Sequence, residues 1–173
     1  MHALMMNTPL MISSILKHAE KNFPEVEMVS VTVDHPRHRQ NNRIFARRCR
    51  QLANVLESLG AAFGDRIGTL AWNDFRHMEL YYAVSGSGMV CHTINPKLFP
   101  EQVAYIINHA EDKILFVDVL VLPLLEALSE HLAKVEVIVV LAEKTHMPES
   151  NLPNLLCYEE LLETQSDVYE WPE

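Results

Sequence analysis

Residues 65–118 read DRIGTLAWNDFRHMELYYAVSGSGMVCHTINPKLFPEQVAYIINHAEDKILFVD, and this stretch decides the fold that the sequence predicts. Three short apolar runs alternate in it with two segments of helical pattern. The runs are Arg66–Trp72, Met89–Ile94 and Lys113–Val117, and the helical segments are Asp74–Val84 and Pro100–Ala110. Near-continuous apolar strands that alternate with helices are typical of a parallel sheet covered on both faces. The sequence therefore predicts an α/β fold with a parallel or mixed sheet flanked by helices.

The boundaries of these segments carry residues suited to their positions. Asn73 offers a side-chain oxygen that would cap the amides at the start of the helix that follows. Asn95-Pro96 ends the second apolar run. Pro100 suits the first position of a helix, because its missing N–H would be unpaired there anyway.

The residues before Asp65 predict two helices and one strand. These are a helix over Leu10–Phe23 with Thr8 as cap and Pro9 at its first position, a strand over Val26–Val33, and a long helix over Asn41–Leu59 closed by Gly60. The first helix places Ile12, Ile15, Leu16 and Ala19 on one face at helical spacing. In the strand Val29, Val31 and Val33 alternate with polar residues, which predicts that the three valines are its buried side. The long helix has the apolar series Phe45, Cys49, Leu52, Leu56 and Leu59 and a basic opposite face.

The residues after Asp118 continue the alternation. They predict a helix over Val121–Ala133, a strand over Val135–Leu141, a loop over Glu143–Pro153 and a short helix over Tyr158–Leu162. The tail, Asp167–Glu173, is acidic and aromatic and has no predicted role in the core.

Composition narrows the class of protein. The chain has 173 residues, enough for one domain with a sizeable core, and a formal net charge of −9. An acidic chain lacks the positive field that nucleic acids and anionic membranes require, so no nucleic-acid partner is expected. Cys49, Cys91 and Cys157 are few and widely spaced, which favours a reducing, cytoplasmic compartment. Neither a signal peptide nor a membrane-spanning segment is predicted.

Phosphate-binding and metal-binding motifs are the first chemical features to seek. The sequence has no GxxxxGK[ST] motif, and Ser85-Gly86-Ser87-Gly88 is the nearest candidate for a phosphate loop. It follows a helix and precedes a strand, the reverse of the order in dinucleotide-binding folds, so a tight turn is the favoured interpretation. The segment Asp34–Arg39 combines His and Asp, but its interleaved arginines would repel a cation and favour a solvated loop.

A run of arginines forms the most concentrated charge in the chain. It comprises Arg37, Arg39, Arg43, Arg47, Arg48 and Arg50. Arg43, Arg47 and Arg50 share a helix face by spacing, where they would attract a phosphate, a CoA tail or RNA. The alternative, which we favour, is that acidic residues elsewhere in the chain pair with them.

Polar residues at strand ends and one cysteine complete the candidates. Trp72–His77 follows the first predicted strand of the central stretch, and His92, Thr93 and Asn95 close the second, at the edge where α/β proteins usually bind ligands. Capping and packing are the favoured roles, because no nucleophile–base pair can be identified. Cys49 lies among arginines that would lower its pKa, yet its place in the apolar series predicts burial.

Several of these segments together resemble the N-terminal region of adenylate-forming acyl-CoA synthetases, most closely fatty-acid–CoA ligases. The similarity rests on LAWN, RHMELYYAV, HTINPKLFPEQVAYIINHAEDK, LFVD and FARRCRQLAN, and it extends from about Thr8 to the closing Trp-Pro-Glu. A departure lies at Asn41-Asn42-Arg43, where the family usually has Thr or Ser and an aromatic residue.

The resemblance implies an ATP-dependent ligase that joins a medium- or long-chain fatty acid to CoA through an acyl-adenylate, with Mg²⁺. Residues 1–173 would then be part of the N-terminal domain and end before the adenylate loop, so no catalytic, cofactor-binding or metal-binding residue is assigned to them. The fragment alone is expected to be inactive, to bind none of these cofactors and to form a homo-oligomer, in which apolar residues of Met1–Leu16 would take part. The alternatives are a non-catalytic interaction or structural module, and a weak CoA- or RNA-binding module that uses the Arg43–Arg50 helix.

Overall fold

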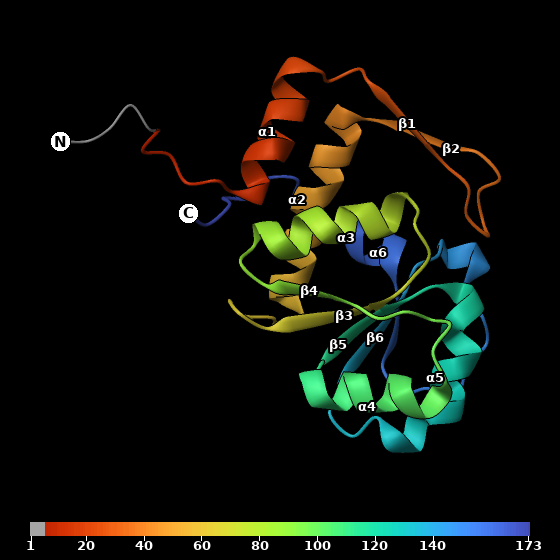
Figure 1. Cartoon of the computed structure of the whole chain (residues 1–173). Helices are drawn as coiled ribbons and strands as arrows, with labels where there is room; N and C mark the ends of the chain where they lie inside the picture. The colour runs from red at the N-terminus through yellow and green to blue at the C-terminus, as the bar shows by residue number, and fades with distance from the viewer. Residues whose placement is uncertain (1–5) are drawn as a thin grey trace.

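A five-stranded parallel sheet forms the centre of the computed structural model, which describes residues 6–173 (Figure 1). Its strands are β3 (Arg66–Leu70), β4 (Val90–Thr93), β5 (Ile114–Val117), β6 (Val137–Val140) and β7 (Leu155–Cys157). They lie in the order β4-β3-β5-β6-β7, and each adjacent pair is parallel. The predicted α/β fold with a parallel sheet is confirmed.

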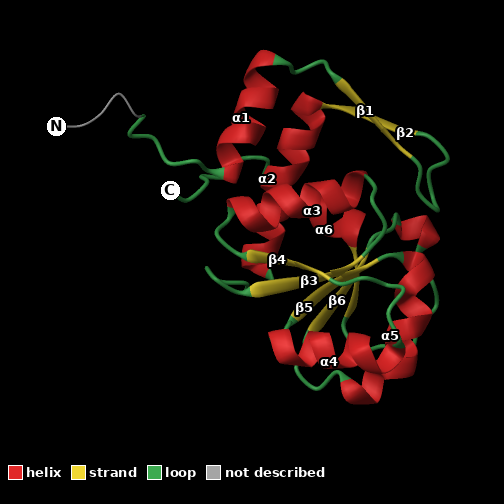
Figure 2. Ribbon diagram, in the orientation of Figure 1, coloured by secondary structure: helices red, strands yellow, loops and turns green. Residues whose placement is uncertain are grey.

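Helices cover both faces of this sheet (Figure 2). The helices α2 (Asn42–Ser58), α3 (Phe75–Gly86) and α6 (Tyr158–Glu163) pack on one face, and α4 (Pro100–Ala110) and α5 (Leu122–Leu128) on the other. Two apolar cores result, one beneath each set of helices. Every residue of β5 is buried, as expected for a central strand covered on both faces.

Several boundaries in the sheet region differ from the predicted ones. Asp74, rather than Asn73, caps α3, because its side chain accepts a hydrogen bond from the His77 N–H. The predicted helix Val121–Ala133 is divided into α5 and two short 3₁₀ helices, Val119–Val121 and Ser129–His131. Another 3₁₀ helix, Lys144–His146, lies within the predicted loop. The strand β7 was not predicted.

The N-terminal part of the chain contributes a helix and a two-stranded ribbon. Helix α1 (Ile12–Asn22) begins two residues later than predicted and has Met11 at its N-cap, so Thr8 and Pro9 lie outside it. The antiparallel ribbon consists of β1 (Glu27–Ser30) and β2 (His38–Asn41), and β2 leads directly into α2. Asn41 caps α2 by accepting a hydrogen bond from the Ile44 N–H.

The apolar residues of this region face the opposite way from the prediction. Val29, Val31 and Val33 are exposed, as are Ile12 and Ile15 on α1, and Leu16 is the buried apolar residue of that helix. Alternation identifies the two sides of a strand but not which side is buried, and here Met28 and Ser30 occupy the inner side.

The C-terminal tail has a structural role that the sequence did not reveal. Trp171 is buried beside Phe45 and Cys49 of α2 and fills the space above Gly86, where an added Cβ would lie 2.7 Å from its ring. Tyr169 donates a hydrogen bond from its hydroxyl group to Glu57. The expectation that residues 167–173 have no role in the core was wrong.

The segment proposed to mediate self-association is described only in part. Residues 1–5 lie outside the described residues, and the predicted contribution of Met1–Leu16 falls partly on them. Of the residues that are described, Met6, Leu10, Ile12 and Ile15 are exposed.

Candidate functional site

The strand order identifies one edge of the sheet as the place for a ligand. The connection that leaves β3 passes through α3 on one face, and the connection that leaves the adjacent β5 passes through α5 on the other. In doubly wound sheets ligands bind at the carboxyl ends of the strands where the connections diverge in this way. We call the space beyond the carboxyl ends of β3 and β5 the switch point.

Two carboxylates lie at the switch point, and both serve the chain itself. Asp74 Oδ1 accepts from the His77 N–H at 2.9 Å, and Asp118 Oδ1 accepts from the Leu120 N–H at 2.9 Å. Burial raises the pKa of both carboxyl groups, and hydrogen bonds from backbone N–H groups oppose the rise. They therefore act as caps of the segments that begin there.

His77 and Thr69 form a hydroxyl–imidazole pair beneath the same edge. His77 Nε2 lies 3.0 Å from Thr69 Oγ1, and Nδ1 lies 3.2 Å from the carbonyl oxygen of Trp72. Burial lowers the pKa of His77, which favours the neutral ring. Both side chains are buried, Thr69 completely, so no substrate reaches the hydroxyl group. A nucleophile–base site is not formed here.

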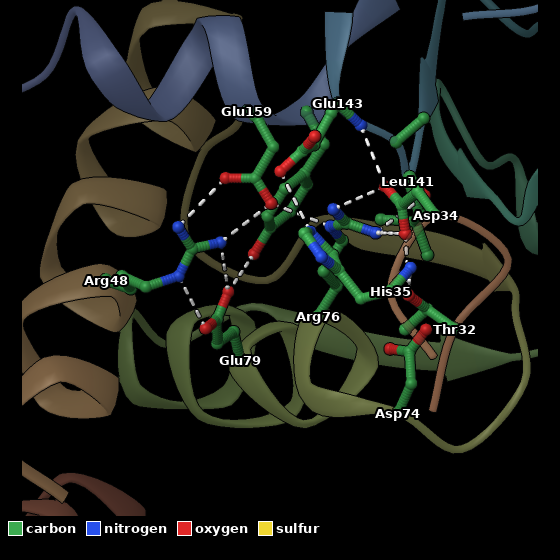
Figure 3. Close-up of polar contacts among 12 residues, drawn as sticks. Thr32, Asp34, His35, Arg48, Asp74, Arg76, Glu79, Leu141, Glu143 and Glu159 are labelled. Atoms are coloured by element: carbon green, nitrogen blue, oxygen red, sulfur yellow. Dashed lines mark hydrogen bonds and ion pairs between the residues drawn. The ribbon is translucent and has the colours of Figure 1, made fainter. Parts of the chain in front are cut away.

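A buried network of ion pairs lies beside the switch point (Figure 3). Glu79 of α3 accepts from Arg48 of α2 at 2.7 and 3.1 Å and from the Tyr158 hydroxyl group at 2.7 Å. Arg48 also donates to Glu159 of α6 at 2.9 and 3.1 Å. One arginine thus joins three helices.

Arg76 extends this network to the ribbon. Its Nε donates to Glu159 at 2.7 Å, and its two terminal nitrogens donate to Asp34 at 3.0 and 2.8 Å. Asp34 also accepts from the Glu143 N–H at 3.0 Å and from the Thr32 hydroxyl group at 2.6 Å. Every charged group of the network therefore has partners within the chain, and we call Arg48, Arg76, Glu79, Glu159 and Asp34 the ion-pair network.

The pKa values of Asp34, Glu159 and the two arginines are shifted in favour of their charged forms. Burial of Asp34 and Glu159 opposes their charged forms, yet the hydrogen bonds and charges of the arginines lower the pKa of both carboxyl groups. The pKa values of Arg48 and Arg76 are raised against the same burial by their carboxylate partners. Burial and the neighbouring Glu79 raise the pKa of Tyr158, which keeps its hydroxyl group a donor.

The arginine run is paired as the favoured alternative predicted. Arg39 pairs with Glu27 and Arg43 with Glu25, and Arg50 contacts Glu20 at 2.8 Å. Arg48 belongs to the ion-pair network, and Arg37 and Arg47 are exposed and pair with no acidic side chain among residues 6–173. The geometry does not form a converging anion site on this helix.

The remaining candidates also have structural roles. Ser85 and Gly86 are the last residues of α3, and Ser87-Gly88 makes the turn to β4, where Gly88 has a φ of +77°. His92 Nδ1 lies 2.7 Å from the buried Asp112, and Asn95 accepts from the Lys97 N–H at 2.9 Å. Within residues 6–173 no group of three His, Cys, Asp or Glu side chains is placed to hold a metal ion.

Cys49 is buried, and burial raises its pKa despite the nearby arginines.

Burial likewise raises the pKa of the Cys91 thiol to about 11. At pH 8 we expect Cys91 to carry about a hundredth of the thiolate of an ordinary exposed cysteine, and to react with iodoacetamide correspondingly slowly. Mass spectrometry of labelled protein measures this rate; the same protein in urea is the control. Labelling of native Cys91 as fast as in urea would contradict the expected burial.

The sequence analysis missed Glu79 and Glu159 of the ion-pair network. It placed Asp34 in a solvated loop, and this expectation was wrong, because the Asp34 side chain is buried against Arg76. Glu79 carried the clearest signal, because it is a charged residue between Met78 and Leu80 on a helix that must pack against a sheet. Its partners could not be chosen from sequence spacing, since Glu159 is 111 positions from Arg48.

The strand order and the carboxyl edge of the sheet define the class of fold. This is a doubly wound parallel α/β domain in which the two carboxylates at the carboxyl edge, Asp74 and Asp118, accept hydrogen bonds from backbone N–H groups. Comparison of the sequence with known families matches residues 16–167 to the family described as AMP-binding enzyme. The chain belongs to this family.

Curated relatives in this family are acyl-CoA ligases. The 3-methylmercaptopropionyl-CoA ligase of Ruegeria lacuscaerulensis is 46% identical over 97% of this chain and 31% of its own length. The medium-chain-fatty-acid–CoA ligase of Ectopseudomonas oleovorans and the long-chain-fatty-acid–CoA ligase of Thermus thermophilus are each 42% identical over 98% of the chain. These matches cover 31% and 30% of the two relatives, so the chain spans about a third of their length.

Solved structures agree on the fold. An anthranilate CoA ligase in complex with anthranoyl-AMP superposes with a TM-score of 0.76 at 22% identity, over 95% of this chain and 30% of that one. The N-terminal domain of FACL13 from Mycobacterium tuberculosis gives a TM-score of 0.68 at 20% identity, over 94% and 37%. In the described part of the chain, no helix is both long and apolar enough to span a membrane.

Proposed function

We propose that residues 1–173 are part of the N-terminal domain of an AMP-forming acid–CoA ligase and serve it as scaffold. The observation that carries the proposal is the family match over residues 16–167 together with 42–46% identity to ligases along almost the whole chain. The complete enzyme would use ATP, CoA and Mg²⁺ to join CoA to a carboxylic acid.

We propose further that residues 6–173 do not themselves bind the nucleotide. Arg48 and Arg76 are already saturated by carboxylates, and Asp74 and Asp118 cap the chain's own amides. The sequence also lacks a phosphate loop. We therefore assign no step of the reaction to residues 6–173 and infer that they position the parts that bind ATP and CoA.

A medium- or long-chain fatty acid is the substrate that we propose. Two of the relatives named above act on such acids, whereas the one from Ruegeria is named for a short thioether acid. The three free cysteines agree with a reducing compartment such as the cytoplasm. The exposed apolar side chains of α1 support our further proposal that the protein forms homo-oligomers.

A chimera tests the proposal directly. Residues 1–173 would replace the matching third of the Ectopseudomonas oleovorans ligase, and ATP-dependent thioester formation would be measured with acids of different length. We expect the chimera to retain ligase activity, because the scaffold is shared and its core residues are compatible with the fold. A folded chimera without activity would contradict the proposal.

A module that acts without the rest of an enzyme is the second possibility. The CoA- or RNA-binding form of this alternative depends on the Arg43–Arg50 helix. The pairing of Arg43 and Arg50 with Glu25 and Glu20 argues against it, because those charges are already neutralised.

A further inference from the structure

The ribbon and its connecting loop, residues 27–41, are attached to the body of the protein differently at their two ends. At the base, the Asn42 N–H donates to the Val26 carbonyl oxygen at 3.1 Å, and the Arg43 N–H donates to that of Pro24 at 3.1 Å. At the other end the loop crosses to the residues that follow β6, which lie far from the base (Figure 1). The base is fixed by backbone hydrogen bonds, and the tip is fixed by side chains.

Between these ends Met28 packs against the apolar cluster beside α2, while the valines of the segment face solvent. Val29, Val31 and Val33 are 52%, 72% and 53% exposed. Gln40 is buried, and both polar atoms of its side chain lack a hydrogen-bond partner among residues 6–173. His38 Nε2 is also buried without a partner. Unpaired buried polar atoms oppose docking, so the closed position of the ribbon depends on other contacts.

Asp34 at the tip supplies the strongest of those contacts. It accepts two hydrogen bonds from Arg76 and one from the Glu143 N–H, and its side chain is buried with that of Arg76 (Figure 3). His35 Nε2 lies 2.8 Å from Glu143 Oε1. The ring of His38 stacks on Phe75 with 3.6 Å between centroids. The tip is therefore held by polar contacts and one stacked pair of rings.

The closed ribbon also borders a hollow next to the switch point. The hollow has a volume of about 290 Å³ and is lined by Ser30 of the ribbon and by Asn73, Asp74, His77, Met78 and Tyr81. The ribbon thus covers the start of α3, the helix that carries Arg76 and Glu79.

We propose that residues 27–41 are a strap that is hinged at its base and latched at its tip by Asp34 and Arg76. When the latch opens, the strap leaves the start of α3 as one unit and uncovers Phe75 and the hollow beside Asp74. Arg76 keeps Glu159 and the Leu141 carbonyl oxygen as partners in the open state, so the sheet and α6 remain in place. This inference is independent of the ligase proposal.

Hydrogen–deuterium exchange of the 173-residue chain tests the strap. In Asp34→Ala we expect the amides of Glu27–Ser30 and His38–Asn41 to exchange at least about 10-fold faster, because a two-stranded ribbon that is no longer docked is only marginally stable and its own hydrogen bonds then open readily. The amides of β3 and β5 should keep their wild-type rates. The matched control is Glu27→Gln, which removes the exposed pair with Arg39 inside the ribbon and should leave the ribbon rates unchanged.

Two results would overturn the proposal. One is that the ribbon amides of Asp34→Ala exchange at the wild-type rate. The other is that the amides of β5 are accelerated in this variant as much as those of the ribbon. If Asp34→Ala does not fold, wild-type exchange in increasing low concentrations of urea decides the question. If the strap exists, the ribbon amides become accessible to exchange at lower urea concentrations than the amides of the sheet. Exchange of both sets at the same urea concentration would contradict the proposal.

Discussion

Replacing Glu79 with alanine is expected to lower the free energy of unfolding by about 3–5 kcal/mol. Glu79 is completely buried and accepts hydrogen bonds from both Arg48 and Tyr158. The substitution leaves a buried guanidinium group with one carboxylate fewer and a buried hydroxyl group without its acceptor. For a chain of 173 residues this corresponds to a fall of about 10 °C in the midpoint of thermal unfolding.

Urea titration followed by circular dichroism measures this loss. The control is Glu160→Gln on α6, which removes the exposed ion pair between Glu160 and Lys144. Exposed ion pairs contribute little, so the control should unfold at the wild-type concentration of urea. A loss below about 1 kcal/mol in Glu79→Ala would show that the ion-pair network does not hold the three helices together.

The second large effect is expected from Trp171→Ala, with a loss of about 3 kcal/mol. Trp171 is 9% exposed and packs against α2 and over Gly86. Its removal leaves an apolar cavity at a point where the tail meets two helices. Gly86→Leu should displace the same ring from the opposite side and shift its fluorescence to longer wavelength.

The chain offers a matched control, because Trp72 is its other tryptophan and is 41% exposed. Its ring contacts the Lys97 amine at 5.7 Å, a contribution of about 0.5–1 kcal/mol. Trp72→Ala should therefore cost less than about 1 kcal/mol. Equal losses in the two variants would contradict the assigned role of the tail.

The sheet was predictable because its strands have local signals. Lys113–Val117 is a short apolar run between helical segments, and the structure has β5 there, at Ile114–Val117. The helix Pro100–Ala110 was predicted with its observed bounds, because Pro100 suits the first turn. By contrast, β7 has three residues, too few to show a period, and its place is set by pairing with β6.

The ribbon and the ion-pair network depend on contacts that sequence spacing does not contain. Alternation over Val26–Val33 predicted a strand, and the structure has β1 at Glu27–Ser30, so Val31 and Val33 lie outside it and the exposed side of the strand is the valine side. The network unites Asp34, Arg48 and Glu159, which belong to three distant segments. The resemblance to ligases predicted that the catalytic groups lie outside these residues, which stays a prediction.

Pyrophosphate release is the measurement that tests the central claim most directly. The purified 173-residue chain and the chimera would each be incubated with ATP, Mg²⁺, CoA and a fatty acid. The pyrophosphate release that depends on the fatty acid would be measured. A scaffold without reactive groups predicts no release from the chain alone and clear release from the chimera. Acid-dependent release from the chain alone, in proportion to its concentration, would contradict the account.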